Sequence, residues 1–192
     1  MIPLVLALLA ATVPSGSVVP ALIRPAPQIG QVLVIGTIDR SFSKRMEAAL
    51  DTSPLLRTVM IESGGGLDSQ AYRTTRLLNA RGITVRVIGK CASACALLWA
   101  GADNRQLRRG ALIGLHAVRP AYQLPDVVES YAHHRRIRLA TDALRSAGFP
   151  RELVARGLAV PHDEVLWLDV EELRSAGVQF RLIERRRKSP DN

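Results

Sequence analysis

Aromatic side chains are scarce in this sequence, at 4% of 192 residues, and acidic residues are outnumbered by basic ones. The chain has 26 Lys and Arg against 17 Asp and Glu, which gives a formal net charge of +9. A basic excess suits nucleic acid or an anionic membrane when it forms a shaped stripe with aromatic residues between the charges. Here the arginines are scattered over every segment. We therefore interpret them as a solvated surface and expect no nucleic-acid partner.

Cysteine is also rare, and its pattern argues against a zinc site. The two cysteines, Cys91 and Cys95, have no histidine at the spacing that zinc ligands require. We expect no metal site and no cofactor.

The sequence has no apolar run long enough to span a bilayer comfortably. Residues 2–13 offer about a dozen apolar positions where ~20 are needed, and small residues with Pro14 follow them. This layout predicts a signal peptide over residues 1–17. Because Lys and Arg are missing before the apolar run, the alternative is an uncleaved anchor, the only expected membrane contact. Residues 18–30, with three prolines, are interpreted as a spacer.

Export would place the domain in the periplasm, or anchored to a membrane and facing the periplasm. Disulfides persist in such an oxidising compartment. Cys91 and Cys95 could therefore pair with each other.

Hydrophobic periodicity predicts strands that alternate with helices. Apolar runs of strand length cover residues 31–38, 55–63, 83–89, 111–118, 164–168 and 178–183. Helical patterns cover residues 42–50, 71–78 and 125–148, a short segment after Pro150, and one that begins at the capping pair Asp169 and Glu172. We expect one α/β domain over residues 31–183, with a mainly parallel sheet covered by helices, followed by a basic polar tail over 184–192. Ligand sites in such sheets lie at the carboxyl ends of the strands.

One of these strand ends carries three consecutive glycines, Gly64, Gly65 and Gly66, in "IESGGGLDSQAYR". Glycines let the backbone turn sharply and approach a bound group, with N–H groups left free at the start of a helix. Such donors suit an anion or a developing oxyanion. A plain flexible turn is the alternative interpretation of the same pattern.

The next strand runs into "GKCASAC", which places Ser93 at the first turn of a helix among small neighbours. This geometry recurs at nucleophilic serines. The alternative is that Ser93 only caps the helix.

A serine nucleophile needs a base, and the sequence has four histidines. His116 lies near the carboxyl end of the strand that follows Ser93, whereas His133 and His134 fall on the polar helix and His162 in a loop. Adjacent strand ends meet at one edge of a sheet, so His116 is the candidate base. The alternative is a hydrogen-bonded core histidine.

Taken in order, these segments resemble the Clp protease and crotonase superfamily, in particular its exported serine-peptidase-like members. The strand followed by "SGGG" resembles the Ser-Pro-Gly-Gly oxyanion loop of the Clp proteolytic subunit. "GKCASAC" resembles its Gly-x-Ala-Ala-Ser-x-Gly nucleophile turn, "IGLHAV" its Ile-His strand, and "VLWLDVEELRSAGV" its closing segment. The resemblance covers residues 31–183 and implies a fold of repeated strand-strand-helix units.

The resemblance also implies roles for individual residues. Ser93 would be the nucleophile and His116 the general base, and the N–H groups of Gly65 or Gly66 and of Ala94 would form the oxyanion hole.

The acid of the triad is expected at Asp163, or at Glu164, because the position of the family's aspartate falls on Val165. Cys95 replaces a glycine of the family's turn, and a bond to Cys91 would clamp it. The helical segment 125–148 would make homo-oligomer contacts.

We therefore expect an exported serine peptidase that hydrolyses a peptide or protein substrate through an acyl-enzyme on Ser93. One alternative is a catalytically inactive binding or scaffold module of the cell envelope with the same fold. Another is a crotonase-type acyl-CoA enzyme, which export argues against because coenzyme A is intracellular.

Overall fold

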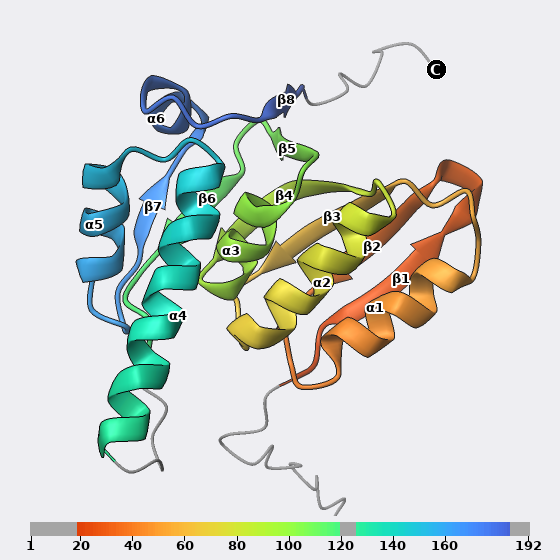
Figure 1. Ribbon diagram of the computed structural model, residues 1–192. Helices are drawn as coiled ribbons and strands as arrows, with labels where there is room; N and C mark the ends of the chain where they lie inside the picture. The colour runs from red at the N-terminus through yellow and green to blue at the C-terminus, as the bar shows by residue number, and fades with distance from the viewer. Residues whose placement is uncertain (1–18, 120–125, 185–192) are drawn as a thin grey trace, which may run out of the picture.

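The computed structural model describes residues 19–119 and 126–184, which form a sheet of mostly parallel strands with helices packed on it (Figure 1). The strands along the main path of the sheet are, in spatial order, β1 Leu22–Ala26, β2 Gln31–Ile35, β3 Thr58–Ser63, β4 Thr84–Ala92, β5 Arg105–Arg108 and β8 Arg181–Ile183. All neighbours on this path are parallel except β1 and β2. The predicted fold class is therefore confirmed.

Two strands branch from the carboxyl end of β4. β6 (Leu112–Leu115) pairs parallel with the last residues of β4, with Ala92 opposite Gly114, and β7 (Leu166–Leu168) pairs antiparallel with β6. This branch brings the residues that follow β4 and β6 to one edge of the sheet.

The first four helices pack side by side in chain order (Figure 1). The helices are α1 Phe42–Asp51, α2 Asp68–Ala80, α3 Ala94–Gly101, α4 Asp126–Ser146, α5 Arg151–Ala159 and α6 Val170–Ser175, with a short 3₁₀ turn η1 at Pro27–Ile29. Both α1 and α2 bury the faces that their spacing predicts, and the Asp169–Glu172 capping box is formed. None of the described helices is long and apolar enough to cross a membrane.

Helix α3 is different, because it is buried on all sides. Every residue from Ala94 to Ala100 is buried, and the Trp99 indole N–H donates to the Gln106 carbonyl at 3.0 Å. A helix that is apolar all round belongs in the core. The turn that precedes α3 is therefore continuous with a helix of the buried core.

The structure corrects the expected start of the domain. The predicted spacer over 18–30 contains β1, which pairs with β2 along its whole length, including Pro25 opposite Val32. An edge strand tolerates proline because one row of its N–H groups faces away from the ladder. β5 was also not predicted from the sequence. The expected signal segment 1–17 and most of the tail 184–192 lie outside the described residues.

Candidate active site

Ser93 sits on a strained turn between β4 and α3. Its φ of 56° and ψ of −126° make it the one non-glycine residue with a positive φ among the described residues. Such a conformation favours glycine and persists only where the surroundings impose it. It projects the side chain from a sharp strand-to-helix turn, as at known nucleophilic serines.

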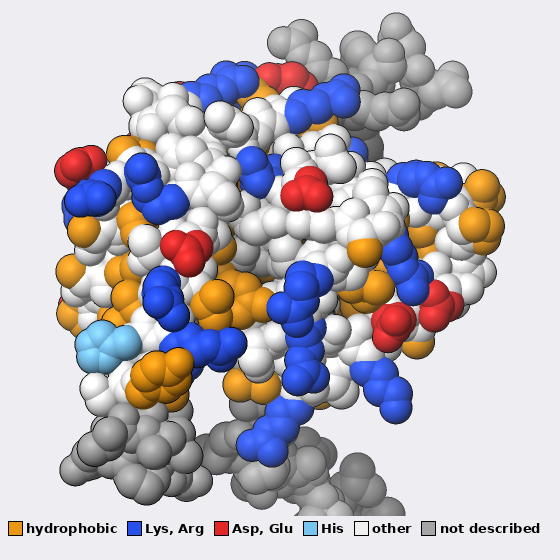
Figure 2. Space-filling view, in the orientation of Figure 1, with side chains coloured by type: hydrophobic (Ala, Val, Ile, Leu, Met, Phe, Trp, Pro, Cys, Tyr) orange, Lys and Arg blue, Asp and Glu red, His pale blue; other side chains and the backbone are white. Residues whose placement is uncertain are grey.

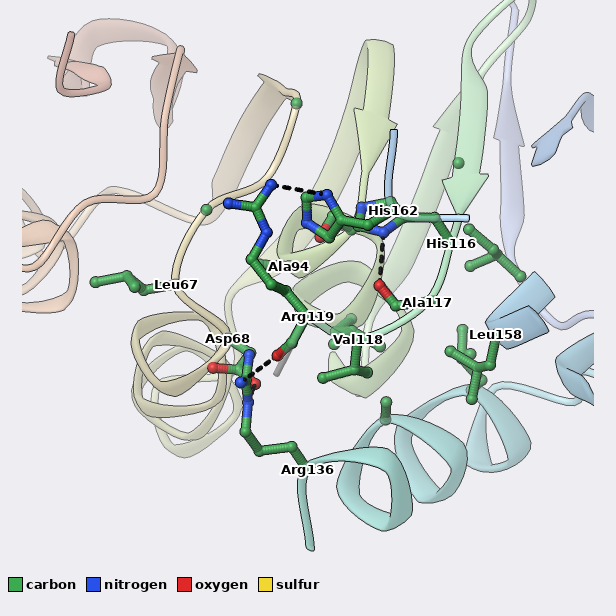
Figure 3. A pocket seen from close by; sticks show the side chains of 18 of the residues that line it. Leu67, Asp68, Ala94, His116, Ala117, Val118, Arg119, Arg136, Leu158 and His162 are labelled. Carbon is green, nitrogen blue, oxygen red and sulfur yellow. Dashed lines mark hydrogen bonds and ion pairs between the residues drawn. The ribbon is translucent and has the colours of Figure 1, made fainter. Parts of the chain in front are cut away.

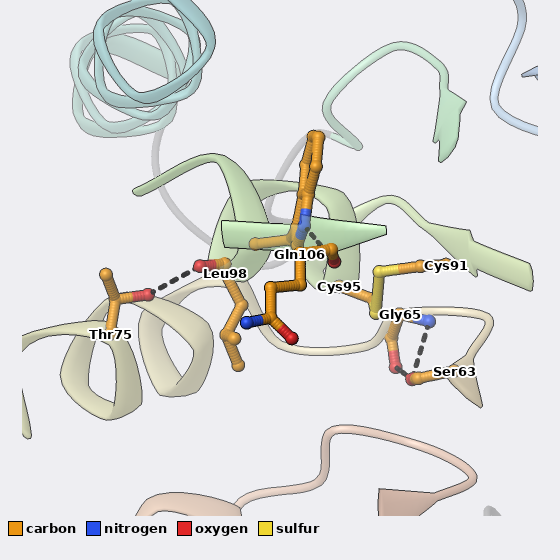
Figure 4. The surroundings of a disulfide bond; sticks show 8 residues. Ser63, Gly65, Thr75, Cys91, Cys95, Leu98 and Gln106 are labelled. Carbon is orange, nitrogen blue, oxygen red and sulfur yellow. Dashed lines mark hydrogen bonds between the residues drawn. A yellow bond between two sulfur atoms is a disulfide. The ribbon is translucent and has the colours of Figure 1, made fainter. Parts of the chain in front are cut away.

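A disulfide joins the two cysteines that flank Ser93 in the sequence. Figure 4 shows this bond beside Gly65 and Ser63. Cys91, at the end of β4, is bonded to Cys95, in the first turn of α3, with their Cα atoms 5.3 Å apart. Both cysteines are fully buried. The expected Cys91–Cys95 pairing is confirmed, and the bond ties the strand side of the turn to the helix side.

The glycine loop lies directly against the Ser93 turn. A Cβ atom on Gly65 would lie 2.7 Å from both the Ser93 Cβ and the Ala92 carbonyl oxygen. On its other side the loop meets the β2–α1 connection, where a Cβ on Gly66 would lie 2.3 Å from the Ile38 carbonyl oxygen. Only glycine fits at both positions, which also have positive φ angles.

The hydrogen bonds of this loop show which of the candidate oxyanion donors already has an acceptor in the protein. The Gly65 N–H donates to the Ser63 hydroxyl at 3.0 Å and is therefore engaged. Within the described residues the N–H groups of Gly66 and Ala94 make no hydrogen bond, and both residues line the cavity beside Ser93. Gly64 also lines the cavity, and an added Cβ would meet nothing within 4 Å there.

His116 reaches the same cavity from the end of β6 (Figure 3). Parallel pairing of β4 with β6 is extended by the Ser93 N–H, which donates to the Gly114 carbonyl at 3.0 Å. The carboxyl ends of the two strands therefore place Ser93 and His116 on neighbouring segments. Within the described residues the Ser93 hydroxyl makes no hydrogen bond.

The His116 ring has a defined tautomer. Its Nδ1 lies 2.8 Å from the Ala117 carbonyl oxygen, which can only accept, so Nδ1 carries the proton. In the neutral ring Nε2 then holds the free lone pair. That is the nitrogen a general base uses when another group orients the ring through Nδ1.

The structure does not bring Asp163 to His116. Asp163 is exposed and makes no hydrogen bond or ion pair with the histidine, and Glu164 is likewise exposed. β7 runs antiparallel to β6, with Leu115 opposite Leu166, so the residues that precede β7 lie beyond the carboxyl end of β6. The turn at 161–163 then places a side chain other than Asp163 beside the His116 ring. In this structure a backbone carbonyl, and not the expected carboxylate, accepts the Nδ1 proton of His116.

That different side chain is His162, which the sequence places in a loop with no assigned role. Its ring stands edge-on to the His116 ring, with the ring centroids 4.7 Å apart. The Arg119 guanidinium donates to His162 Nδ1 at 2.9 Å. Burial, the Arg119 charge and the nearby His116 together hold the pKa of His162 below its usual value.

Arg119 connects this histidine pair to the helices on the far side of the cavity (Figure 3). Its carbonyl accepts a hydrogen bond from Arg136 on α4 at 2.7 Å. Arg136 also donates to the Asp68 carboxylate, on the first turn of α2, at 2.6 Å. A continuous polar chain thus joins α2, α4, the segment after β6 and the loop before β7. No local sequence signal marks it, since its members are far apart in the chain.

The cavity itself has a volume of about 740 Å³. Its apolar wall comes mainly from α3, α4, α5 and the segment around His116, and includes Leu97, Leu115, Val118, Ala140, Leu144 and Leu158. Its polar lining includes Ser93, the two histidines and three arginines. No group of three or more potential metal ligands occurs among residues 19–119 and 126–184.

The largely parallel sheet and the helices packed on it form a fold that known structures share. One is described as an asparagine-to-aspartate mutant of ClpP1 from Listeria monocytogenes, which matches with a TM-score of 0.64 and 20% sequence identity. The match covers 83% of this chain and 94% of that chain. This protein therefore has the fold of a Clp protease subunit. No protein-family model matches the sequence, and no curated protein matches it.

Proposed function

We propose that this protein is a serine peptidase that cleaves peptide bonds through an acyl-enzyme on Ser93. The observation that carries the proposal is the strained Ser93 turn, which opens into a cavity lined also by His116, Gly66 and Ala94. The N–H groups of Gly66 and Ala94 have no hydrogen-bond partner in the part of the chain that the structure describes. These are the parts that acyl transfer requires: a nucleophile, a base and donors for the oxyanion.

In the first step the Ser93 oxygen attacks the substrate carbonyl carbon, and its proton passes to His116 Nε2. The negative charge that develops on the carbonyl oxygen is held by the N–H groups of Gly66 and Ala94. We assign no oxyanion role to Gly65, because its N–H already donates to Ser63. His116 then gives the proton to the leaving amine, and the acyl group remains on Ser93.

In the second step a water molecule attacks the acyl carbon, and the same histidine first takes and then returns a proton, which frees the new carboxyl group and restores Ser93. The Ala117 carbonyl holds the His116 ring throughout by accepting from Nδ1. The proposed machinery is therefore a serine–histidine dyad oriented by the backbone, with no role for Asp163.

The direct test is covalent labelling of the purified protein by a fluorophosphonate, with the modified residue located by mass spectrometry. We expect label on Ser93, none on Ser93→Ala, and labelling of His116→Ala at least about 100-fold slower. Ser175→Ala, at an exposed serine at the end of α6, is the matched control and should label like the wild type. A folded wild type without label would instead favour the inactive binding module.

We also propose that the protein is exported and acts in an oxidising compartment. Support comes from the buried Cys91–Cys95 disulfide, since such bonds persist in exported proteins. Cell fractionation of the full chain with a C-terminal tag, followed by N-terminal sequencing, tests this and shows whether residues 1–17 are removed. Recovery of the uncleaved, reduced chain from the cytosol would refute it.

A homo-oligomer built through the 125–148 segment is a further part of the proposal. The first half of α4 projects beyond the sheet (Figure 1), and Tyr131 on it is 70% exposed. Sedimentation of the wild type should show a species larger than a monomer, and Tyr131→Glu should shift it toward the monomer. A monomeric wild type would overturn this part.

A further inference from the structure

The cavity beside Ser93 has an unbalanced charge. Three arginines line it, Arg40, Arg119 and Arg136, against one acidic residue, Asp68. Asp68 is already paired with Arg136. Within the described residues Arg40 makes no hydrogen bond or ion pair, and Arg119 donates to a histidine, so neither guanidinium is neutralised by a carboxylate.

These two arginines come from opposite sides of the nucleophile. Arg40 lies in the β2–α1 connection, which is bridged to the glycine loop at Ile38 and Gly66. Arg119 follows β6 and lies on the side of His116 and His162. The rest of the face that carries the helices shows Lys and Arg in several separate groups (Figure 2). What distinguishes Arg40 and Arg119 is that they line the cavity beside Ser93 and, among the described residues, have no carboxylate partner.

The excess of positive charge in the cavity also affects the protonated form of His116. When Ser93 gives up its proton, the His116 ring becomes a cation next to His162 and the Arg119 network, and among the described residues no carboxylate is hydrogen-bonded to it. Like charges in a partly enclosed site repel one another. An anion bound at Arg119 would offset that repulsion and so stabilise the transition state.

We propose that the site selects peptides in which an acidic side chain stands next to an apolar one. The apolar side chain fits the cavity wall of Leu97, Leu144 and Leu158, and the carboxylate binds Arg119 with Arg40 as the second cation of the rim. The substrate carboxylate thereby supplies part of the negative charge that an acid of the protein would otherwise give to His116. This inference rests on the proposed peptidase function.

The test uses two internally quenched decapeptides that are identical except for Glu or Gln beside a central leucine. The wild type should cleave the Glu peptide about five-fold faster in kcat/KM, and the preference should shrink with added salt. Arg40→Gln and Arg119→Gln should each reduce the preference toward one. Arg119→Glu should invert it in favour of a Lys peptide. Arg73→Gln, at an exposed arginine on α2 that does not line the cavity, should keep the wild-type preference.

The outcomes separate this inference from the proposed function. Labelling of Ser93 together with equal cleavage of the Glu and Gln peptides would overturn the substrate preference and leave the peptidase intact. If Ser93 is not labelled and neither peptide is cleaved, calorimetry of peptide binding decides. Tighter binding of the Glu peptide, lost in Arg119→Gln but not in Arg73→Gln, supports the anion subsite alone. Equal binding of the two peptides refutes it.

Discussion

Gly65 and Ser93 are packed so closely that no side chain fits between them: a Cβ on Gly65 would lie 2.7 Å from the Ser93 Cβ. The glycine loop and the nucleophile turn are thus a single packed unit, although 28 positions separate them in the sequence. Within this unit the Cys91–Cys95 bond joins the residues on either side of Ser93 in the sequence. Its geometry follows from backbone contacts, so small changes at its glycines should have large effects.

The first prediction is that Gly65→Ala destabilises the fold and disables the site. The added methyl group meets backbone atoms that cannot rotate away, and the residue has a φ of 104°. We expect the free energy of unfolding to fall by about 3 kcal/mol, from overpacking and backbone strain together.

The matched control is Gly110→Ala, at a glycine with a φ of 82° and nothing within 4 Å of an added Cβ. It carries the backbone strain without the clash and should lose only about 1 kcal/mol. Urea unfolding of the three proteins measures both effects. Equal losses in the two variants would show that contact with the Ser93 turn costs nothing.

The second prediction concerns the strain stored at Ser93 itself. Ser93→Gly and Ser93→Ala both remove the hydroxyl and should both abolish fluorophosphonate labelling. Glycine relaxes at a φ of 56°, whereas alanine does not. We therefore expect Ser93→Gly to be more stable than Ser93→Ala by about 1 kcal/mol in urea unfolding. If Ser93→Ala proves the more stable of the two, the turn is not strained.

The third prediction is that the disulfide holds the nucleophile turn in shape. The bond closes a very short loop, so its loss in Cys91→Ala/Cys95→Ala should lower the free energy of unfolding by about 2 kcal/mol. Because Ser93 lies inside that loop, fluorophosphonate labelling should slow by more than the loss of folded protein explains. Labelling rates are compared at a urea concentration where both proteins are folded. If the labelling rate of the folded variant equals that of the wild type, the disulfide contributes to stability but does not shape the Ser93 turn.

Much of the fold could be predicted because its buried strands and helices leave simple patterns. The strands β2, β3 and β4 lie inside the sheet and appear as apolar runs, and α1 and α2 show helical spacing. The two missed strands lack that signal: β1 contains Pro25, and β5 buries only Leu107 among polar neighbours.

The residues of the candidate site also fall into those that a local sequence pattern identifies and those that only tertiary packing brings together. Ser93 and the glycine loop were identifiable because their turn residues are local in sequence, and His116 because it ends a strand. The partners of His116 were not, since they depend on where the turn at 161–163 takes the chain. That path brings His162 to the ring and leaves Asp163 exposed. The Asp68–Arg136–Arg119 chain is likewise set by tertiary packing alone.

The fourth prediction is a pH effect that comes from His162. Its pKa is lowered in the folded protein, chiefly by burial and then by Arg119 and His116. As the pH falls, His162 therefore binds a proton in the unfolded chain at a higher pH than in the folded protein. The free energy of unfolding decreases as the pH falls from 6.5 through the folded pKa of His162. His162→Gln should show a smaller decline of the unfolding midpoint between neutral and acidic pH. Parallel pH profiles for the two proteins would exclude His162 as the cause.

The fifth prediction is that the Asp68–Arg136 pair holds α4 over the cavity. Both side chains are largely shielded, with relative exposures of 18% and 29%, and Arg136 also binds the Arg119 carbonyl. Asp68→Asn leaves the Arg136 charge beside Arg119 without its carboxylate, so we expect a loss of about 1–2 kcal/mol, between the values for exposed and buried pairs. Asp51→Asn breaks the more exposed pair with Arg81, in which the side chains of Asp51 and Arg81 are 59% and 35% exposed, and should cost less than about 0.5 kcal/mol.

Hydrogen exchange adds a local readout, because α4 amides should exchange faster in Asp68→Asn only. Equal costs and unchanged α4 protection in both variants would mean that apolar packing alone fixes the helix against the cavity.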